Sequence, residues 1–497
     1  MTDSSKIVDL LVIGGGINGA GIAADAAGRN LSTMLVEKGD LASGTSSWST
    51  KLIHGGLRYL EFFEFGLVRK ALLERDVLTK AAPHIIKPIA FNIPQLPNSR
   101  SNLVLRIGLF LYDSLARSSI FQRSRAINFS NKHCSPLVPS IKKGFEYWDA
   151  QVDDSRLVVL NAQQAAQKGA VIKTYTECVG LQESPDGWLV SLRDSSGGKT
   201  EVRARVVVNA AGPWVARLLE KLFSVKPPVG ARLVKGSHIV VPKLYKGSQA
   251  FMLQHKDGRV IFVIPYLDKY SLIGTTESEF DGELEKATIS DEEIKYLISL
   301  SNEYFSLQLT PKDIVSTYSG VRPLIDEDGK DMSKVSRDYH LELRKGACPL
   351  LSVYGGKVTT YRTLAEDALK AIEHYLPTIG KSWTRDAVLP GGRYTDDTAL
   401  DNEVAQLAPW LDSKIRNRWL RTYGADTKKL LEGISTSDEL GKTFGHGLYE
   451  REIKYLVSNE WARSAEDILW RRTKLGYDFS QDEALLLDEY VARHISA

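Results

Sequence analysis

The chain has few cysteines for its length. Among 497 residues there are three, Cys134, Cys178 and Cys348, and they are widely separated. An odd number of cysteines without a Cys-x-x-Cys pair argues against a disulfide framework and against a zinc site. We therefore expect three free thiols in a reducing compartment, and no bound metal ion.

An excess of charge of one sign is missing as well. The chain has 64 Lys and Arg residues against 61 Asp and Glu residues, which gives a net charge of +3. Proteins that bind nucleic acid usually carry a much stronger basic bias, so we expect no nucleic-acid partner.

The sequence also has no long hydrophobic run. None of its apolar stretches approaches the ~18 residues that a membrane-spanning helix requires. The apolar run 10–13 is short and leads directly into glycines, so it predicts a strand and not a signal peptide. We expect a protein that does not cross a membrane but that can lie on one.

What the chain does have is a pattern of several domains, because its length exceeds what one ordinary core accommodates. Residues 7–37 predict a strand, a glycine turn, a helix and a second strand, which form one βαβ unit. The later patterns predict helices at 57–82, 151–170 and 290–306, and strand-rich regions at 171–210 and 228–276. After LPGG at 389–392 the chain becomes charged and helical, which places a domain boundary near 390. One apolar stripe is predicted there, from Ile453, Leu456, Val457, Trp461, Ala465, Ile468 and Leu469.

The first turn has the spacing of a dinucleotide-binding loop. Gly14, Gly16 and Gly19 fit G-x-G-x-x-G, and they stand between an apolar strand and a helix, where the pattern has physical meaning. These glycines allow a tight turn and a close approach to a pyrophosphate, and the helix start offers free N–H groups. Glu37 ends the next strand, where its carboxylate can accept hydrogen bonds from ribose hydroxyls. The alternative is a glycine-rich turn beside a surface glutamate.

Two later segments bear on whether the dinucleotide is FAD or NAD. The stretch 39–47 is small, polar and rich in hydroxyls, so it can wrap a long cofactor, but it can equally be a solvent loop. The apolar stretch 206–214 ends in small residues, which lets the backbone approach a ligand, although an ordinary core strand has the same composition. Composition alone leaves both alternatives open.

A set of motifs spread along the chain is far more specific. They are GGGINGAGIAADAAGR (14–29), KLIHGGLRYLE (51–61), NAAGPW (209–214), KGSHIVVP (235–242), SGVRPL (319–324), YGGKVTTYR (354–362) and LPGG (389–392). Between about residue 7 and residue 477 the chain resembles the FAD-dependent glycerol-3-phosphate dehydrogenases, and most of all the bacterial aerobic, respiratory form. Two positions depart from the family pattern: Trp48 replaces a small residue, and Glu277 replaces the more common Asp.

The resemblance implies an α/β fold of the D-amino-acid-oxidase type. A Rossmann-like, discontinuous FAD-binding domain is expected at 1–95, 145–225 and 315–390. A substrate domain built on an antiparallel sheet is expected at 96–144 and 226–314, with candidate membrane-facing helices. An all-helical C-terminal domain is expected at 391–497.

The glycine turn, the hydroxyl-rich loop and the resemblance together select the candidate FAD-binding residues. Lys357 among them could stabilise negative charge on the reduced flavin. The set is Gly14, Gly16, Ile17, Asn18, Gly19, Glu37, Lys38, Thr45, Ser46, Ser47, Ser49, Lys51, Leu52, His54, Val179, Ala211, Gly212, Gly356, Lys357, Val358 and Thr359.

The candidate substrate residues follow from the chemistry of a phosphate and a secondary alcohol. An arginine fork matches phosphate oxygens, and Arg58 and Arg322 stand in small and apolar segments where an unpaired charge is costly. Any single arginine is more often paired with a structural carboxylate, and the resemblance is what favours these two. Arg337 is a weaker candidate, because it can pair with Asp338, and Tyr59 adds a hydroxyl.

The oxidation also needs a base for the alcohol proton, and histidine suits it. Our hypothesis is that His54 orients or deprotonates the substrate hydroxyl, and the alternative is that it only hydrogen-bonds the flavin or the backbone. With Arg58 and Arg322 it makes up the predicted catalytic set.

The resemblance implies oxidation of sn-glycerol 3-phosphate to dihydroxyacetone phosphate by hydride transfer to FAD, with electrons passed to a membrane quinone, which the family indicates is ubiquinone. It also implies a homodimer at the cytoplasmic face of the inner membrane. The competing interpretations are an oxidase that uses oxygen, a related FAD amine or 2-hydroxy-acid oxidase, and a non-catalytic flavin sensor.

Two apolar stripes are candidates for contact with the bilayer. The first is Leu103, Val104, Ile107, Phe110 and Leu111, with Arg106 and Arg117 nearby, and the second is Phe62, Phe63, Phe65 and Leu67, followed by Arg69 and Lys70. A basic amphipathic helix can lie in the interface of a membrane. The alternative is that both stripes belong to the core.

Overall fold

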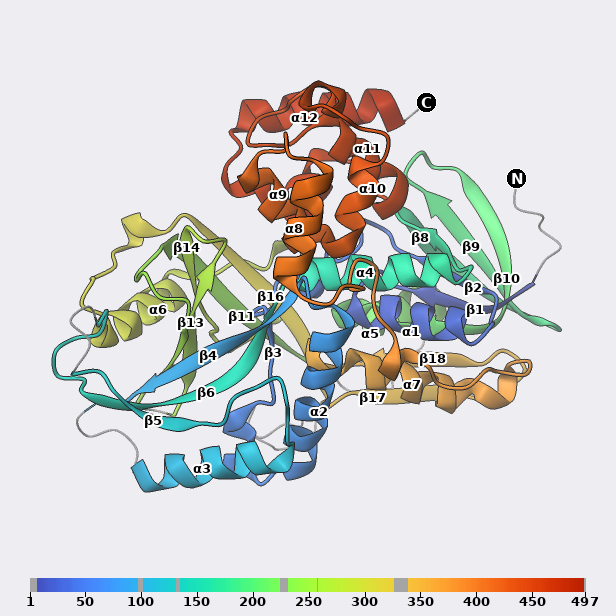
Figure 1. Cartoon of the computed structure of the whole chain (residues 1–497). Coiled ribbons are helices and arrows are strands. Elements are labelled where there is room, and N and C mark those ends of the chain that lie inside the picture. Colours follow the sequence, from blue (N-terminus) through green and yellow to red (C-terminus); the bar gives the residue numbers. More distant parts are fainter. Residues whose placement is uncertain are drawn as a thin grey trace.

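The computed structural model describes residues 7–96, 102–130, 135–223, 231–256, 258–325 and 338–495. In these residues the chain forms two sheets and a group of C-terminal helices. In Figure 1 the first sheet lies at the right, the second sheet at the left, and the C-terminal helices at the top. Two residues named above, Cys134 and Arg337, lie outside the described residues. Among the helices that the structure describes, none has both the length and the apolar character needed to span a membrane.

The first sheet is the predicted dinucleotide-binding sheet. Four of its neighbouring pairs are parallel, in the order β18, β10, β1, β2 and β7, and β17 pairs with β18 in the antiparallel sense. A hairpin of β8 and β9 continues from β10. The bounds are β1 Ile7–Ile13, β2 Thr33–Val36, β7 Val171–Lys173, β8 Thr176–Ser184, β9 Gly187–Asp194, β10 Lys199–Asn209, β17 His340–Arg344 and β18 Leu350–Tyr354.

Small residues allow the first helix to pack closely. Helix α1 (Ile17–Gly28) is rich in alanine and packs against α4 (Asp154–Gln167) and α7 (Tyr361–Ile372). A Cβ atom at Gly21 would lie 2.7 Å from the ring of Tyr361, so a larger residue there would push α7 away. The α1 alanines share one core with the buried faces of β1 and β10.

The second sheet is almost entirely antiparallel, apart from the parallel pair β12 and β4. Its order is β15, β11, β14, β13, β12, β4, β6 and β3, with β16 beside β11 and β5 beside β6. The bounds are β3 Leu52–Ile53, β4 Ile86–Pro94, β5 Arg125–Asn128, β6 Lys143–Val152, β11 Ala231–Pro242, β12 Ala250–Gln254, β13 Val260–Tyr266, β14 Tyr270–Gly274, β15 Ser278–Glu279 and β16 Ser316–Ile325. Helix α6 (Asp291–Tyr304) packs on β11 and β12.

The domain boundaries that we expected stay a prediction, but the strand pairing bears on them. Strands β4, β6 and β16 pair in the second sheet, although they fall mainly in ranges that we assigned to the FAD-binding domain. A division by sheet would move them to the substrate domain. Their alternating patterns predict strands without predicting which sheet they join.

The C-terminal part is helical, as predicted, with its own core. Its helices are α8 Asp397–Leu407, α9 Ser413–Tyr423, α10 Thr427–Leu431, α11 Glu450–Glu460, the short π-helix η12 Asp467–Arg472, and α12 Gln481–Ile495. The predicted stripe is not one continuous helix, because α11 ends at Trp461, whose φ of 56° is left-handed. Ile453 and Leu456 precede this break, and Ile468 and Leu469 follow it in η12.

The predicted helix at 57–82 is also divided. A 3-10 helix, η2 (Leu57–Phe62), ends at Phe63, whose φ of 60° is left-handed, and α2 (Phe65–Ala81) follows. The hydrophobic pattern runs through both pieces, so it could not reveal the break. The break separates Arg58 and Tyr59 from the long helix.

Candidate active site

Four parallel strands end at the same edge of the first sheet, and the predicted cofactor residues follow them. Gly14 comes after β1, Glu37 after β2, Ala210 after β10 and Gly355 after β18. Ligands of open α/β sheets bind outside this carboxyl edge. The topology therefore brings together four segments that are far apart in the sequence.

The glycine turn leaves no room for side chains. Gly14 has a φ of 114°, and a Cβ atom there would lie 2.5 Å from the carbonyl oxygen of Ala210. A Cβ atom at Gly19 would lie 1.9 Å from the carbonyl oxygen of Gly14. At the start of α1, the amide of Ile17 donates to Ser46 Oγ at 3.0 Å. This turn fits a pyrophosphate, which helix N-termini favour, and Ser46 reaches the same place.

Glu37 is held by backbone amides. Its Oε2 accepts from the amide of Gly15 at 2.7 Å, and its Oε1 accepts from the amide of Gly39 at 2.8 Å. Burial raises the pKa of the Glu37 carboxyl, and these two hydrogen bonds oppose the rise. Each carboxylate oxygen keeps a second lone pair, which a ribose hydroxyl can use.

The loop after Glu37 lies across β16 and β11. Thr45 Oγ1 donates to the carbonyl oxygen of Val321 at 2.5 Å, and Tyr318 donates through its hydroxyl to the carbonyl oxygen of Ser49 at 2.8 Å. The loop thus connects the glycine turn with the strand that carries Arg322.

Several predicted cofactor residues already have partners within the protein. Lys51 pairs with Asp154 Oδ1 at 2.8 Å, and Ser49 donates to Asp154 Oδ2 at 2.7 Å. Lys38 lies at the surface with its Nζ 3.3 Å from Glu285 Oε1. These contacts indicate that Ser49 and Lys51 shape the loop, and their direct role toward a cofactor stays a prediction.

The other predicted cofactor residues are distributed as follows. Ser47 donates to the carbonyl oxygen of Ala42 at 2.6 Å, and Leu52 is buried in β3. Val179 lies half-buried at a β-bulge in β8. Ala211 and Gly212 are half-buried just after β10.

The segment 355–360 contacts both the start of α1 and the segment that carries His54 and Tyr59. Asn18 donates to the carbonyl oxygen of Gly355 at 3.1 Å, and the amide of His54 donates to Thr359 Oγ1 at 3.3 Å. Lys357 Nζ lies 3.9 Å from the centre of the Tyr59 ring. Gly356 has a φ of 98°, and Val358–Thr360 form a 3-10 turn before α7. His54 and Tyr59 therefore lie beside this segment in the fold.

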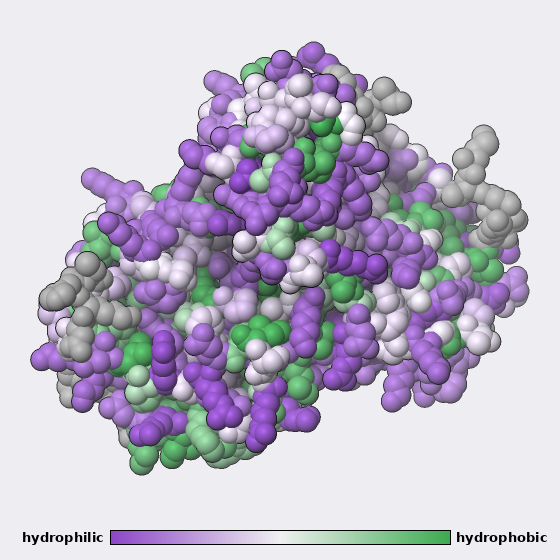
Figure 2. Space-filling view, in the orientation of Figure 1, coloured by the Kyte–Doolittle hydropathy of each residue, from purple (hydrophilic) through white to green (hydrophobic). Residues whose placement is uncertain are grey.

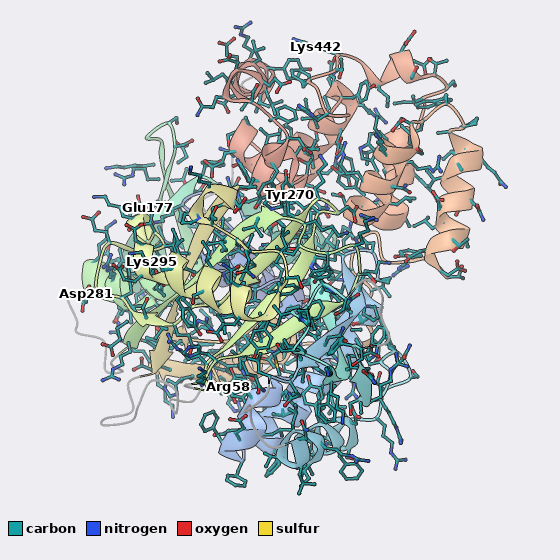
Figure 3. The ribbon with its side chains drawn as sticks, turned by 90° about the vertical axis from the view of Figure 1, so that its left-hand side faces the viewer. Arg58, Glu177, Tyr270, Asp281, Lys295 and Lys442 are labelled. Atoms are coloured by element: carbon teal, nitrogen blue, oxygen red, sulfur yellow. The ribbon has the colours of Figure 1, made fainter. Side chains whose placement is uncertain are left out.

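Arg58 is a half-buried cation without a partner in the described part of the chain, where it has neither a hydrogen bond nor an ion pair. It belongs to η2, next to Tyr59. Figure 3 shows it in the lower half of the molecule, far from Lys442 of the C-terminal part at the top. A cation that is partly removed from water and unmatched by the protein favours an anionic ligand.

Arg322 approaches from the second sheet. It pairs in register with Val234 of β11, and a Cβ atom at Gly236 would lie 3.0 Å from Arg322 Nη2. Gly355 lies close to the next residue, since its Cβ position would be 3.6 Å from the carbonyl oxygen of Pro323. The residues that follow Arg58 and Arg322 in the chain, Tyr59 and Pro323, therefore adjoin the segment 355–360.

His238 is a site residue that sequence reasoning missed. It stands in KGSHIVVP, a motif that we noted without assigning a role to its histidine. Its Nε2 lies 3.0 Å from Thr50 Oγ1, its ring stacks on Tyr318, and its Nδ1 is buried without a partner. Burial, with smaller contributions from the charges of Lys51 and Arg322, lowers the pKa of His238 to about 3. It is therefore neutral at neutral pH.

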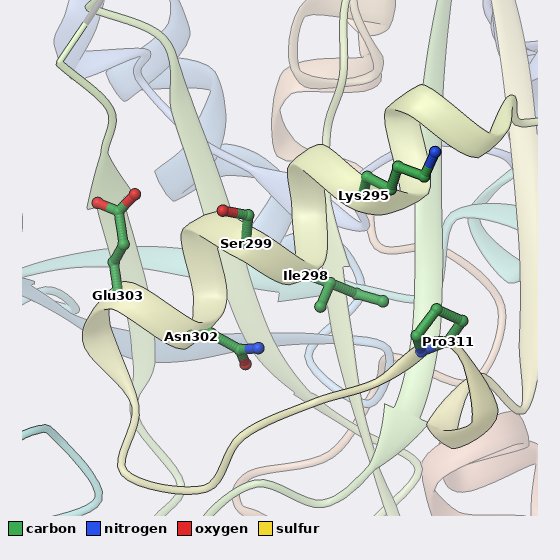
Figure 4. Close-up of a pocket in the computed structure, with 6 residues that line it drawn as sticks. All are labelled: Lys295, Ile298, Ser299, Asn302, Glu303 and Pro311. Carbon is green, nitrogen blue, oxygen red and sulfur yellow. The ribbon is translucent and has the colours of Figure 1, made fainter.

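An open hollow elsewhere does not add to this site. Lys295, Ile298, Ser299, Asn302, Glu303 and Pro311 line it, along α6 and the turn that follows (Figure 4). The Asn302 amide already exchanges two hydrogen bonds with the backbone of Leu309.

Comparisons with known proteins agree with the two-part architecture. Residues 9–362 match the family described as FAD dependent oxidoreductase, and residues 382–496 match the C-terminal domain of alpha-glycerophosphate oxidase. A solved structure of a glycerol-3-phosphate dehydrogenase from Bacillus halodurans, complexed with FAD, is similar with a TM-score of 0.75 and 29% identity. The similarity covers 99% of this chain and 92% of that one.

Three curated relatives are similar over nearly their whole length. A glycerol-3-phosphate dehydrogenase from Pseudomonas aeruginosa is 49% identical, covering 98% of this chain and 95% of the relative. The aerobic glycerol-3-phosphate dehydrogenase of Escherichia coli is 46% identical, covering 98% and 97%. A D-erythritol 1-phosphate dehydrogenase from Brucella abortus is 47% identical, covering 94% of both chains.

Proposed function

We propose that this chain, which belongs to the FAD-dependent glycerol-3-phosphate dehydrogenase family, oxidises sn-glycerol 3-phosphate to dihydroxyacetone phosphate. The observation that carries the proposal is the half-buried Arg58, which has no partner among the described residues and precedes Tyr59, whose ring contacts Lys357. A phosphorylated substrate needs such a cation, whereas amino-acid and hydroxy-acid oxidases have no phosphate to bind. The cofactor is FAD, and the glycine turn, Glu37 and the buried acceptor Asn18 Oδ1 fit it.

The residues have separate tasks in this proposal. FAD bound at the carboxyl edge would supply the hydride acceptor for C2 of the substrate. Arg58 and Arg322 hold the phosphate from the two sides of the segment 355–360. Lys357 adds positive charge at the same place, and Tyr59 lies under its ammonium group. Arg337 stays a weaker candidate for the phosphate.

The proton of the substrate hydroxyl needs a base, and two histidines are candidates. We propose His54, whose backbone is joined to Thr359. The alternative is His238, which has a free buried nitrogen, although its low pKa makes it a weak base in the protein alone. A bound phosphate dianion would offset the charge of Arg322 and raise the basicity of His238.

A second candidate substrate is D-erythritol 1-phosphate. The relative of that name is as similar to this chain as the glycerol-3-phosphate dehydrogenases are. Both substrates present a phosphate and a secondary alcohol, so the two arginines serve either one. The choice between them depends on the room around the rest of the polyol chain.

We also propose that a membrane quinone takes the electrons, at the cytoplasmic face of the inner membrane. Support comes from α3 (Asn102–Leu115), where Leu103, Val104, Ile107 and Phe110 are 66%, 61%, 51% and 69% exposed. The alternative that this stripe is core is wrong for these residues. Figure 2 shows hydrophobic residues along the lower edge of the molecule, where Figure 1 places α3. Phe63 is 79% exposed, which extends the apolar surface to the second stripe.

The charges around α3 fit an anionic bilayer. Arg106 and Arg117 are exposed, and so is Arg69 in α2. Apolar side chains flanked by arginines are typical of helices that lie in a membrane interface. We propose the homodimer as well, and light scattering of the purified protein in detergent tests it.

The first experiment is an anaerobic visible spectrum of the purified protein before and after the addition of substrate. We expect sn-glycerol 3-phosphate to bleach the oxidised-flavin band, and a short-chain quinone to restore it faster than oxygen does. Stronger bleaching by D-erythritol 1-phosphate would favour the second substrate. A flavin band that neither phosphate changes would contradict the proposed activity, and rapid recovery in oxygen would favour an oxidase.

A further inference from the structure

Asp40, three residues after Glu37, is 2% exposed and binds two arginines of the C-terminal domain. Its Oδ2 accepts from Arg471 Nε at 2.6 Å and from Arg472 Nη1 at 2.9 Å, and its Oδ1 accepts from Arg472 Nη2 at 2.8 Å. Both arginines belong to η12, 431 and 432 residues further along the chain. The turn 37–40, beside the dinucleotide site, is thus held by ion pairs to a domain that has no residue in the predicted site.

The two arginines are themselves fixed by other buried groups. Arg472 is fully buried and also donates to the carbonyl oxygen of Glu460 at 2.6 Å. The carboxylate of Glu460 forms a bidentate pair with Arg156 of α4. Figure 1 shows the C-terminal helices over α4. The ion pairs therefore lie where the C-terminal domain meets the dinucleotide-binding sheet.

Arg471 is also linked to Gly39, on the other side of the turn, through Asp467 and Tyr175. Its Nη2 donates to Asp467 Oδ1 at 2.6 Å, and Tyr175 donates to both oxygens of Asp467 at 2.8 Å. The amide of Tyr175 in turn donates to the carbonyl oxygen of Gly39 at 2.9 Å. Gly39 is the residue whose own amide binds Glu37. The turn 37–40 is consequently fixed at Gly39 and at Asp40.

This network of ion pairs fixes the position of the turn 37–40 more than it adds to the free energy of folding. Removing charges from water costs much of what their attraction returns, so buried ion pairs often add little to the free energy of folding. What they do is allow one geometry, since a small shift leaves a buried charge unmatched. Apolar contacts, which the interface also has at Trp461, would join the domains without fixing the turn so closely.

We infer that Arg471 and Arg472 are positioning residues for the cofactor: through Asp40 the C-terminal domain holds the turn 37–40 in the shape in which Glu37 receives the dinucleotide. Affinity for FAD then depends on a domain that has no residue in the predicted site. The inference rests on FAD in the glycine turn and not on the substrate, so it survives if the proposed substrate is wrong.

The test replaces the ion pair between Asp40 and Arg472 by apolar side chains, so that no buried charge is left without a partner. In the double variant Asp40→Leu with Arg472→Met, Arg471 keeps Asp467, and Glu460 keeps Arg156. The holoenzyme is diluted, and the dissociation constant of FAD is measured from the flavin fluorescence that release restores. We expect the constant to rise at least tenfold while the thermal midpoint in excess FAD changes little.

The matched control is a buried ion pair within the C-terminal domain. Arg418 donates to both oxygens of Glu452, which is fully buried, at 2.6 and 2.7 Å. The double variant Arg418→Met with Glu452→Gln should leave the FAD dissociation constant within twofold of the native one. Equal loss of FAD in both double variants would overturn the inference, because general destabilisation would then account for it. Unchanged affinity in the Asp40 variant would overturn it too.

A milder variant keeps the test open if the first one does not fold. Asp40→Asn keeps the shape of the side chain and one acceptor oxygen but loses the charge. We expect a severalfold rise in the FAD dissociation constant, and an unchanged constant would overturn the inference.

Discussion

The side chain of Asn18 donates a hydrogen bond of 3.1 Å to the carbonyl oxygen of Gly355, 337 residues later in the chain. Asn18 is the second residue of α1, after the glycine turn, and Gly355 follows β18. The bond therefore ties together two segments of the carboxyl edge where the cofactor is expected, one after β1 and one after β18, with β10 between these strands. The other atom of this amide, Oδ1, is buried without a partner, and the ribityl hydroxyls of FAD are donors that could match it.

Replacing Asn18 should accordingly weaken FAD binding. In Asn18→Ala we expect the FAD dissociation constant to rise about tenfold, equivalent to ~1.4 kcal/mol, because one bond across the edge and one acceptor are lost. Flavin fluorescence after dilution measures it. Asn459→Ala is the control, since the Asn459 side chain donates within its own helix, to the carbonyl oxygen of Tyr455, and an equal effect there would refute the assignment.

Substitution of Arg58 should act on the substrate and not on the cofactor. In Arg58→Met we expect the substrate concentration for half-maximal flavin reduction to rise about a hundredfold, or ~3 kcal/mol, because a charge-assisted contact with phosphate is lost. Arg58→Lys should fall in between, since lysine keeps the charge without the fork. Stopped-flow reduction under anaerobic conditions measures both. Arg69→Met, an exposed arginine of α2, should behave as the native protein, and a normal Arg58→Met would exclude Arg58 from the phosphate site.

The two candidate bases can be separated by pH profiles. If His54 takes the proton, His54→Gln should lower the rate of flavin reduction about a hundredfold and flatten its pH dependence, whereas His238→Gln should retain the native profile. The opposite pattern would assign the base to His238. The rate constant at saturating substrate, measured from pH 6 to pH 9, is the readout.

Stability should depend on pH through His84, which is buried with neither ring nitrogen bonded. Burial, with smaller effects of Arg156 and Lys87 and an opposing one of Asp397, lowers the pKa of His84 to about 3. The unfolded chain takes up a proton near pH 6.5, and the folded protein does not until about pH 3. The contribution of neutral His84 to the free energy of unfolding is complete above pH 6.5. It is lost progressively as the pH falls from 6.5 to about 3.

Between pH 7 and pH 5 the loss due to His84 is about 2 kcal/mol. The thermal midpoint of His84→Leu should therefore fall less over this range than that of the native protein. His374→Leu is the control, because the His374 side chain is 86% exposed. Identical pH dependence in the native protein and in His84→Leu would show that His84 titrates normally.

The exposed face of α3 should bind lipid. Phe110→Ser is expected to reduce cosedimentation with vesicles containing anionic lipid several-fold, because a large apolar side chain is removed from the interface. Leu485→Ser in α12 provides the match, since Leu485 is 63% exposed and Phe110 is 69% exposed. Equal binding of the two variants would contradict the membrane surface on α3.

Local patterns predicted the elements whose determinants are close in sequence. The apolar strand, the glycine turn and the alanine-rich helix at 7–28 form as expected, because the turn needs only its own glycines. The helix near 290–306 starts with a capping box in which Ser290 and Glu293 exchange hydrogen bonds. Four neighbouring residues contain that information.

Other features have no signal in any short segment. The breaks at Phe63 and Trp461 interrupt apolar stripes that continue on both sides, and β4, β6 and β16 could have joined either sheet. In the sequence His238 is indistinguishable from other residues of its strand, and only the fold brings it into contact with Thr50. The exposure of α3 is a further case, since an apolar stripe is compatible with a core or with a surface.

The sequence by itself determined the family, the cofactor-binding turn and the residues Glu37, His54, Arg58 and Arg322 as candidates, because motif spacing and residue chemistry are local properties. The tertiary structure decided which of these residues meet, that Arg58 has no partner in the described residues, and that Asp40 belongs to Arg471 and Arg472. Each of those outcomes depends on packing between segments hundreds of residues apart, and burial and ion pairing exist only once that packing is complete.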